Sequence, residues 1–188
     1  MKTLRVRIGV EIGLTVALCA VLSFFSPWQM PQGGSPSLSM LPIFVLAILR
    51  GWKPGVLAGV VYGGVDLMLE PYFFTPVQVL LDYPLAYALC GLAGVVSARW
   101  WRLSDAEDGS KAALLALVPG VAIGALGRYA AHVLSGIVFF SAYAIEAGQA
   151  PLIYSLAYNS FVLVSGVVCA ILAAAILPLL RRVLGRSA

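Results

Sequence analysis

The sequence has very few charged residues. Only 11% of its 188 residues are Asp, Glu, Lys or Arg, whereas 61% are hydrophobic and the mean hydropathy is +0.97. A soluble domain carries about 25% charged residues. Eight acidic and twelve basic side chains are too few to cover the surface of a soluble protein of this length. The composition therefore predicts an integral membrane protein and excludes soluble, disordered, collagen-like and disulfide-scaffold classes.

Several motifs that carry chemistry are also missing. Cys19, Cys90 and Cys169 lie in apolar runs without a CxxC or Cys/His spacing, which predicts buried thiols, no metal site and no disulfide framework. No GxxxxGK[ST] phosphate loop is present, so uphill transport would need energy from an ion or a partner. The two halves show no obvious internal repeat, which argues against a self-sufficient inverted-repeat transporter. No cofactor is expected.

Charge-free apolar stretches predict an all-α, polytopic membrane protein with six transmembrane helices in one bundle, a single domain over residues 1–188. A bilayer core requires about 20 apolar residues per helix. The expected spans are 8–27, 38–49, 55–69, 76–98, 112–140 and 153–180.

Three of these spans have alternative interpretations. The first resembles a secretory signal, but no small-x-small cleavage site follows it, so we interpret it as a span. The second and third are short and could form a re-entrant hairpin. That hairpin would strand Arg50 and Lys53 in the membrane, at about 2.5 to 3.5 kcal/mol each, so two spans are favoured.

The basic residues predict the orientation. Lys and Arg occur before the first span, between the second and third, between the fourth and fifth, and after the sixth, whereas the loops near 28–37, 70–75 and 141–152 have none. By the positive-inside rule, both termini are cytoplasmic. The bases form no patch interleaved with aromatic residues, so the pI near 9.1 does not indicate nucleic-acid binding.

Polar residues at one depth predict a pocket. Ionisable residues inside spans mark functional sites. At 1.5 Å per residue, Asp82, His132 and Asn159 lie about 9 to 12 Å below the outer ends of spans four, five and six. Tyr83 follows Asp82, and Tyr154 lies one turn above Asn159. Together these side chains predict an outward-facing pocket.

One face of the fifth span contributes further residues to this pocket. Arg128, His132, Gly136 and Phe140 recur every four residues and therefore share a helix face. Gly136 either leaves a gap for a flat ligand between His132 and Phe140 or permits close helix packing.

The surroundings of two charged residues in spans can also be predicted. Arg128 lies deeper than the pocket, and we expect it to form an ion pair with Asp66 or Asp82. Glu11 lies near the cytoplasmic end of its span and is expected to reach water.

The chemistry of the pocket suits a small flat cation. A carboxylate pairs with positive charge, and aromatic faces contribute a cation–π attraction of about 0.5 to 2 kcal/mol each. Asp82 disfavours an anionic ligand. Acid–base catalysis by Asp82 and His132 is an alternative, although no serine elbow, metal-ligand triplet or phosphate motif accompanies them. A purely structural membrane protein is a further alternative.

Four groups of short motifs, in order along the chain, resemble the thiamine-specific substrate-binding component of energy-coupling factor (ECF) transporters. They are Met30–Ser35 with Leu38–Pro42, Asp82-Tyr83 with Gly91–Gly94, Gly127–Tyr129 with His132, Ser135-Gly136 and Phe139-Phe140, and Tyr154–Asn159. The resemblance covers nearly the whole chain.

The resemblance implies a non-catalytic subunit that captures thiamine outside the cell, in the plasma membrane of a prokaryote. A separate module of two ATP-hydrolysing subunits and a transmembrane coupling subunit would supply the energy. A substrate-binding component for another flat vitamin, such as riboflavin, is the alternative interpretation. The substrate-binding residues implied by the matching positions are Asp82, Tyr83, His132, Gly136, Phe140, Tyr154 and Asn159.

The chain also departs from the family. Some members have Glu at position 82 and Trp at position 140, and an aromatic residue of the first outer loop is replaced here by Gly33-Gly34. Trp28 or Tyr72 could compensate for that aromatic residue.

A strip of small residues lies on the first span. Gly9, Gly13 and Ala17 repeat at four-residue spacing, which allows another helix to approach closely. The strip either packs inside the bundle or, as the resemblance implies, docks onto the coupling subunit.

Overall fold

The computed structural model describes residues 2–26, 29–31, 34–106 and 110–184, and within these ranges the chain forms helices and no strands. The all-α membrane fold predicted from the sequence is confirmed. The helices are α1 (Lys2–Ser23), α2 (Met40–Arg50), α3 (Trp52–Leu69), α4 (Pro76–Leu80), η1 (Leu81–Leu85), α5 (Ala86–Cys90), η2 (Gly91–Val96), α6 (Ser97–Ser104), α7 (Ser110–Phe139), α8 (Ser141–Glu146), α9 (Pro151–Tyr158) and α10 (Phe161–Leu184).

Four helical segments are long and apolar enough to cross a membrane. They are Leu4–Ser23, Pro76–Ser104, Lys111–Phe139 and Pro151–Val183. The segment from Pro76 runs without interruption through α4, η1, α5, η2 and α6. Each of the six predicted spans coincides with a helical segment, but their boundaries differ. The last predicted span is in fact two helices, α9 and α10, which are separated by Asn159 and Ser160.

The short helix α2 forms the centre of the core. Its 11 residues extend only about 16 Å at 1.5 Å per residue, and nine of them are buried. A helix that is apolar on all sides is stable when other helices surround it. Phe44 and Ile48 are fully buried, and the indole nitrogen of Trp101 donates a hydrogen bond to the carbonyl of Leu49 at 3.1 Å.

Close backbone approach fixes α3 against the segment that carries Asp82. A Cβ atom on Gly59 would overlap the backbone of Tyr87, and one on Gly91 would overlap the backbone of Val56. Glycine is therefore required on both sides of this contact. The contact positions α3 next to η1 and α5.

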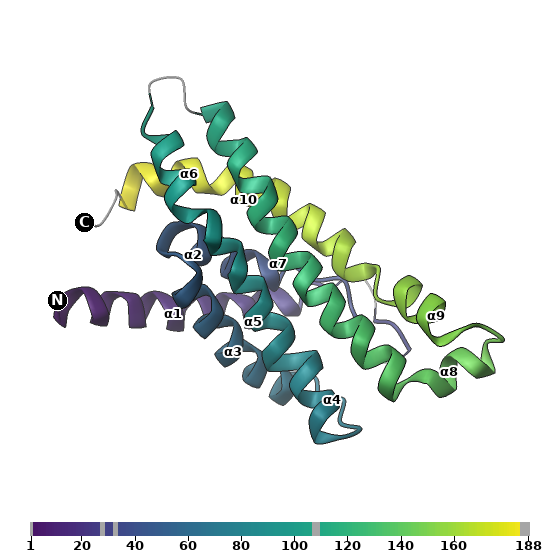
Figure 1. The fold of residues 1–188 in the computed structure, drawn as a ribbon. Helices are drawn as coiled ribbons and strands as arrows, with labels where there is room; N and C mark the ends of the chain where they lie inside the picture. The colour runs from purple at the N-terminus through teal and green to yellow at the C-terminus, as the bar shows by residue number, and fades with distance from the viewer. Residues whose placement is uncertain (1, 27–28, 32–33, 107–109, 185–188) are drawn as a thin grey trace.

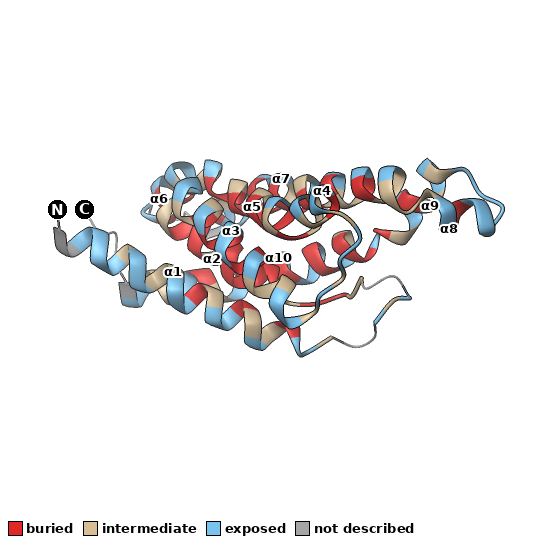
Figure 2. Cartoon of the chain, turned by 90° about the horizontal axis from the view of Figure 1, so that it is seen from below, coloured by how far each residue is buried: buried red, intermediate tan, exposed pale blue. Residues whose placement is uncertain are grey.

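Helix α1 lies at the edge of the bundle, where it packs against α2 and α3, and most of its surface is exposed (Figure 2). The Glu11 side chain is 22% exposed, so it reaches water as expected, and it is also ion-paired. Its carboxylate accepts two hydrogen bonds from Arg50, both at 2.7 Å, and one from Arg7 at 3.2 Å. Because Arg50 is the last residue of α2, this ion pair ties α1 to the rest of the bundle.

The two ends of the molecule differ in charge. The start of α1, helix α6 and the end of α10 lie at one end, whereas α4, α8 and α9 lie at the other (Figure 1). The basic residues of the described spans belong to the first end, apart from Arg128 in the middle of α7. By the positive-inside rule, the end with α4, α8 and α9 faces outward.

Candidate functional site

A cavity opens at the end of the molecule that carries α4, α8 and α9. It measures about 900 Å³ when its open mouth is included, and its walls come from α3, η1, α7, α9 and the segment before α2. All seven residues predicted to bind the substrate line this cavity. They are Asp82, Tyr83, His132, Gly136, Phe140, Tyr154 and Asn159.

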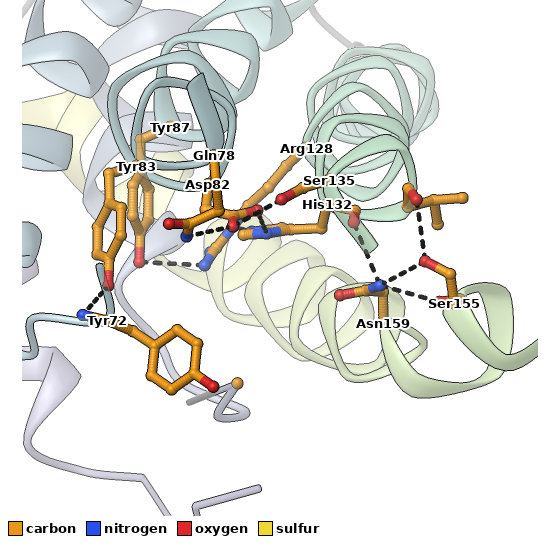
Figure 3. Close-up of polar contacts among 12 residues, drawn as sticks. Tyr72, Gln78, Asp82, Tyr83, Tyr87, Arg128, His132, Ser135, Ser155 and Asn159 are labelled. Carbon is orange, nitrogen blue, oxygen red and sulfur yellow. Dashed lines mark hydrogen bonds and ion pairs between the residues drawn. The ribbon is translucent and has the colours of Figure 1, made fainter. Parts of the chain in front are cut away.

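Asp82 lies in a widened helical turn. The turn η1 is π-helical and contains Pro84, which has no backbone N–H to continue an α-helical ladder. Such single π turns are frequent at functional sites. The turn directs the Asp82 carboxylate toward α7, where it meets His132 and Ser135 (Figure 3).

Three donors surround the Asp82 carboxylate. Gln78 Nε2 donates to Oδ2 at 2.7 Å, Ser135 Oγ donates to Oδ2 at 2.8 Å, and His132 Nδ1 lies 3.0 Å from Oδ1. An ionised carboxylate has about four lone-pair positions, so one remains for a ligand. The sequence analysis missed Gln78 and gave Ser135 no role. Their spacing could have identified them, because Gln78 lies four residues before Asp82 and Ser135 three residues after His132, on the same helix faces.

Arg128 has different partners from those expected. Among the described residues it forms no ion pair with Asp66 or Asp82. Its Nε donates to His132 Nε2 at 3.2 Å, its Nη2 donates to the Tyr87 hydroxyl at 3.1 Å, and the guanidinium lies 4.1 Å from the centre of the Tyr87 ring. His132, one turn further along α7, stands between Arg128 and Asp82, so the charges interact through the imidazole.

Gly136 serves close helix packing. A Cβ atom at this position would overlap Ser155 Oγ on α9, so glycine lets α9 pack directly against α7. Ser155 Oγ donates to the carbonyl of Val133 at 2.9 Å across the same contact. Of the two alternatives for Gly136, the structure therefore favours packing over a gap for the ligand.

Asn159 ends α9 and links it to α7. Its Nδ2 donates to the Ser155 carbonyl at 2.9 Å and approaches the His132 carbonyl at 3.4 Å. These bonds occupy the amide nitrogen. Its Oδ1 has no partner among the described residues and is the group available to a ligand.

Aromatic residues line the mouth of the cavity. Tyr83 donates to the Glu70 carbonyl at 2.9 Å and accepts from the Tyr72 N–H at 2.9 Å, which holds the α3–α4 loop in place. The Tyr72 ring lies 5.8 Å from the Phe140 ring. A hydrogen bond with Tyr143, together with burial, raises the pKa of Tyr72 to about 12, so its phenol is neutral at physiological pH.

A second aromatic group covers the α9 side. Tyr154 and Tyr158 stack with their ring centres 6.1 Å apart, and the Phe161 ring lies 6.1 Å from His132. Gly34 packs against Tyr158 and Phe161, neither of which the sequence analysis assigned a role of its own. Trp28 and Gly33 lie outside the described residues, whereas Tyr72 does line the cavity, where it was expected to compensate for a missing aromatic residue.

Negative charge exceeds positive charge in the lining. The carboxyl groups of Asp66, Glu70 and Asp82 face the cavity together with a single guanidinium, that of Arg128. Tyr62 donates to Asp66 at 2.8 Å. Glu70 lies just beyond the end of α3, where burial and the charge of Asp66 raise its pKa. The described residues contain no group of three His, Cys, Asp or Glu side chains that could hold a metal ion.

These features define a helical membrane protein with a ligand cavity whose carboxylates and aromatic rings suit a small, flat cation. The chain belongs to the thiamine transporter family: the model of the family described as "Thiamine transporter protein (Thia_YuaJ)" matches residues 9–184.

Individual relatives agree with this assignment. The chain is 39% identical over 166 residues to thiamine transporter ThiT of Bacillus subtilis, covering 86% of this chain and 85% of the relative. It is 34% identical over 153 residues to ThiT of Lacticaseibacillus paracasei, covering 79% and 75%. The solved structure of ThiT from Listeria monocytogenes superposes with a TM-score of 0.79 at 30% identity, covering 91% of this chain and 95% of that one.

Proposed function

We propose that this chain is the thiamine-binding subunit of an ECF-type uptake transporter in the plasma membrane of a prokaryote. The observation that carries the proposal is the Asp82 carboxylate, which three donors hold inside a cavity lined by aromatic rings. Thiamine is a cation with two flat rings, an aminopyrimidine and a positively charged thiazolium, which a methylene group joins. Its chemistry therefore matches both the charge and the rings of this cavity.

Each group of lining residues has a role in this proposal. The Asp82 carboxylate uses its remaining lone-pair position to accept a hydrogen bond from the ligand, and its charge offsets the charge of the ligand. Phe140 and Tyr154 present aromatic faces to the two rings. Tyr83 holds the α3–α4 loop, and Asn159 offers its side-chain carbonyl. Gly136 acts indirectly, by bringing α9 close to α7.

Titration of the detergent-purified protein tests this function. Thiamine should bind with a stoichiometry of one, and riboflavin at the same concentration should not compete, because riboflavin is neutral and does not gain from the charge of the cavity. As an independent measurement, small molecules that co-purify with the protein are released and identified by mass spectrometry. Binding of riboflavin in preference to thiamine would overturn the proposal. Chemical conversion of thiamine by the purified protein would instead support the alternative of an intramembrane enzyme.

The energy for uptake comes, in this proposal, from a partner module of two ATP-hydrolysing subunits and a transmembrane coupling subunit. Gly9, Gly13 and Ala17 on α1 support such a partner, because all three are exposed. No atom comes within 4 Å of a Cβ built on Gly9 or Gly13. The strip therefore does not pack inside the bundle, and we assign it to docking of the coupling subunit.

A further inference from the structure

Arg128 lines the cavity and bonds to a residue that contacts Asp82. It is 6% exposed and reaches His132 Nε2 through its Nε at 3.2 Å, while His132 Nδ1 lies 3.0 Å from Asp82 Oδ1 (Figure 3). The three side chains thus form a linear relay. The direction of its hydrogen bonds follows from the donors and acceptors that each group possesses.

A guanidinium has only N–H donors and no acceptor. Since Arg128 Nε–H points at His132 Nε2, that ring nitrogen accepts through its lone pair and carries no proton. A neutral imidazole carries one proton, so the proton lies on Nδ1. His132 Nδ1–H therefore donates to Asp82 Oδ1, and the carboxylate accepts.

A doubly protonated ring does not fit this arrangement. An imidazolium would place Nε2–H opposite Arg128 Nε–H, so two donors would face each other across 3.2 Å in a buried site. A buried donor left without an acceptor is destabilising, because it has lost its bond to water and gained none in the protein. The contact between His132 and Asp82 is accordingly a hydrogen bond to a neutral ring, and His132 does not cancel the charge of Asp82.

Arg128 is itself held in place on its other side. Its Nη2 donates to the Tyr87 hydroxyl at 3.1 Å, and that hydroxyl lies 3.3 Å from Ser39 Oγ, which lies 2.8 Å from Ser37 Oγ. In the bond between Tyr87 and Ser39 either hydroxyl can be the donor. The guanidinium is thus held between His132 on one side and Tyr87 on the other.

We propose that Arg128 is a positioning residue that fixes the single proton of His132 on Nδ1 and thereby keeps the Asp82 carboxylate an unneutralised acceptor for the cationic ligand. The consequence for the ligand rests on the proposed function, whereas the position of the proton does not. The two parts are therefore tested separately.

The test uses the fact that the chain contains one histidine. Nitrogen-15 NMR of protein labelled at the imidazole nitrogens reports His132 alone, in ligand-free protein at neutral pH. The expected spectrum is that of the neutral Nδ1–H tautomer, although free histidine in water prefers the Nε2–H tautomer. A wild-type spectrum of the Nε2–H tautomer or of the imidazolium would overturn the proposal without any variant.

Two variants form a matched pair. In Arg128→Gln the amide oxygen can accept from an Nε2–H while Nδ1–H still donates to Asp82, so the imidazolium should gain population, offset the charge of Asp82 and lower thiamine affinity at least tenfold. Arg128→Lys retains a group that only donates, so the neutral Nδ1–H ring should persist and affinity should stay closer to that of the wild type. The same protonation of His132 in the Gln and Lys variants would overturn the proposal. Size-exclusion profiles and circular dichroism check that both variants fold.

The outcomes separate this inference from the proposed function. If the wild-type protein binds no thiamine but shows the Nδ1–H tautomer that Arg128→Gln removes, the proposed function fails and the assignment of the proton is supported. If thiamine binds and the tautomer does not respond to Arg128→Gln, the proposed function is supported and the role of Arg128 is overturned.

Discussion

At the scale of the residue, the proposed function assigns recognition of the ligand to the charge of Asp82. Asp82→Asn keeps the shape of the side chain but removes its charge, and it turns one acceptor oxygen into a donor that faces Gln78, Ser135 or His132. We expect thiamine affinity to fall more than tenfold, about 1.4 kcal/mol. Titration calorimetry measures the change. Asp105→Asn is the control, because Asp105 pairs with Arg181 at the opposite end of the molecule. An unchanged affinity would remove Asp82 from the site.

Gly136 permits the contact between α7 and α9. In Gly136→Ala the added Cβ meets Ser155 Oγ, so the helices must separate. We expect a loss of stability of about 1 to 3 kcal/mol, typical of an overpacked core, together with weaker thiamine binding. Thermal unfolding in detergent measures the first effect. Ser155→Ala in the same protein should restore part of the stability, whereas Gly64→Ala, where no atom is near, should have little effect. Equal melting temperatures for Gly136→Ala and Gly64→Ala would refute this role.

The sequence predicts some of these residue contacts and misses others for physical reasons. The depths of Asp82, His132 and Asn159 follow from the rise of a helix, and the three do line one cavity. The partners of Arg128 depend instead on rotamers and on which helix faces which, and spacing alone does not determine these. Gln78 is also missed, because it lies close to the outer end of its predicted span, where a polar residue carries less signal than it does at the depth of Asn159.

At the scale of the element, the widened turn η1 directs Asp82 into the cavity. Pro84→Ala supplies the missing backbone N–H, which favours a regular α-helix and turns Asp82 away from Ser135 and His132. We expect thiamine affinity to fall severalfold while the protein remains folded. Calorimetry on Pro84→Ala is compared with Pro119→Ala, which alters a proline inside α7 away from the cavity. The hypothesis fails if the two variants bind thiamine equally well.

The number of helical segments can be predicted from the sequence, but not all of their boundaries. Six apolar stretches predict six helical segments, because hydrophobic length and charged turns are strong signals in a membrane protein. The break between α9 and α10 is not predicted, since no glycine or proline marks it and the apolar pattern continues across it. That break is what turns Asn159 toward α7, where its amide meets Ser155 and the His132 carbonyl.

At the scale of the whole molecule, the proposed binding surface and the proposed docking surface lie apart. The cavity lies among η1, α7 and α9, whereas α1 lies at the edge of the bundle and contributes only Ser23, in its last turn, to the cavity lining. The small-residue strip of α1 faces away from the bundle. A change on the strip should therefore affect coupling and leave binding intact.

Gly13→Leu tests this separation. A leucine at the centre of the strip prevents close approach of a partner helix, and its Cβ has no atom of another helix within 4 Å, so it does not displace the neighbouring helices of the subunit. We expect uptake of labelled thiamine into cells to be abolished, while calorimetry on the isolated subunit shows affinity within about twofold of the wild type, a difference of about 0.4 kcal/mol. Leu18→Trp, which adds bulk on another exposed face of α1, should reduce uptake much less. Loss of binding together with uptake would show that the strip supports the fold of the subunit. Normal uptake by Gly13→Leu would place the coupling surface elsewhere on the molecule.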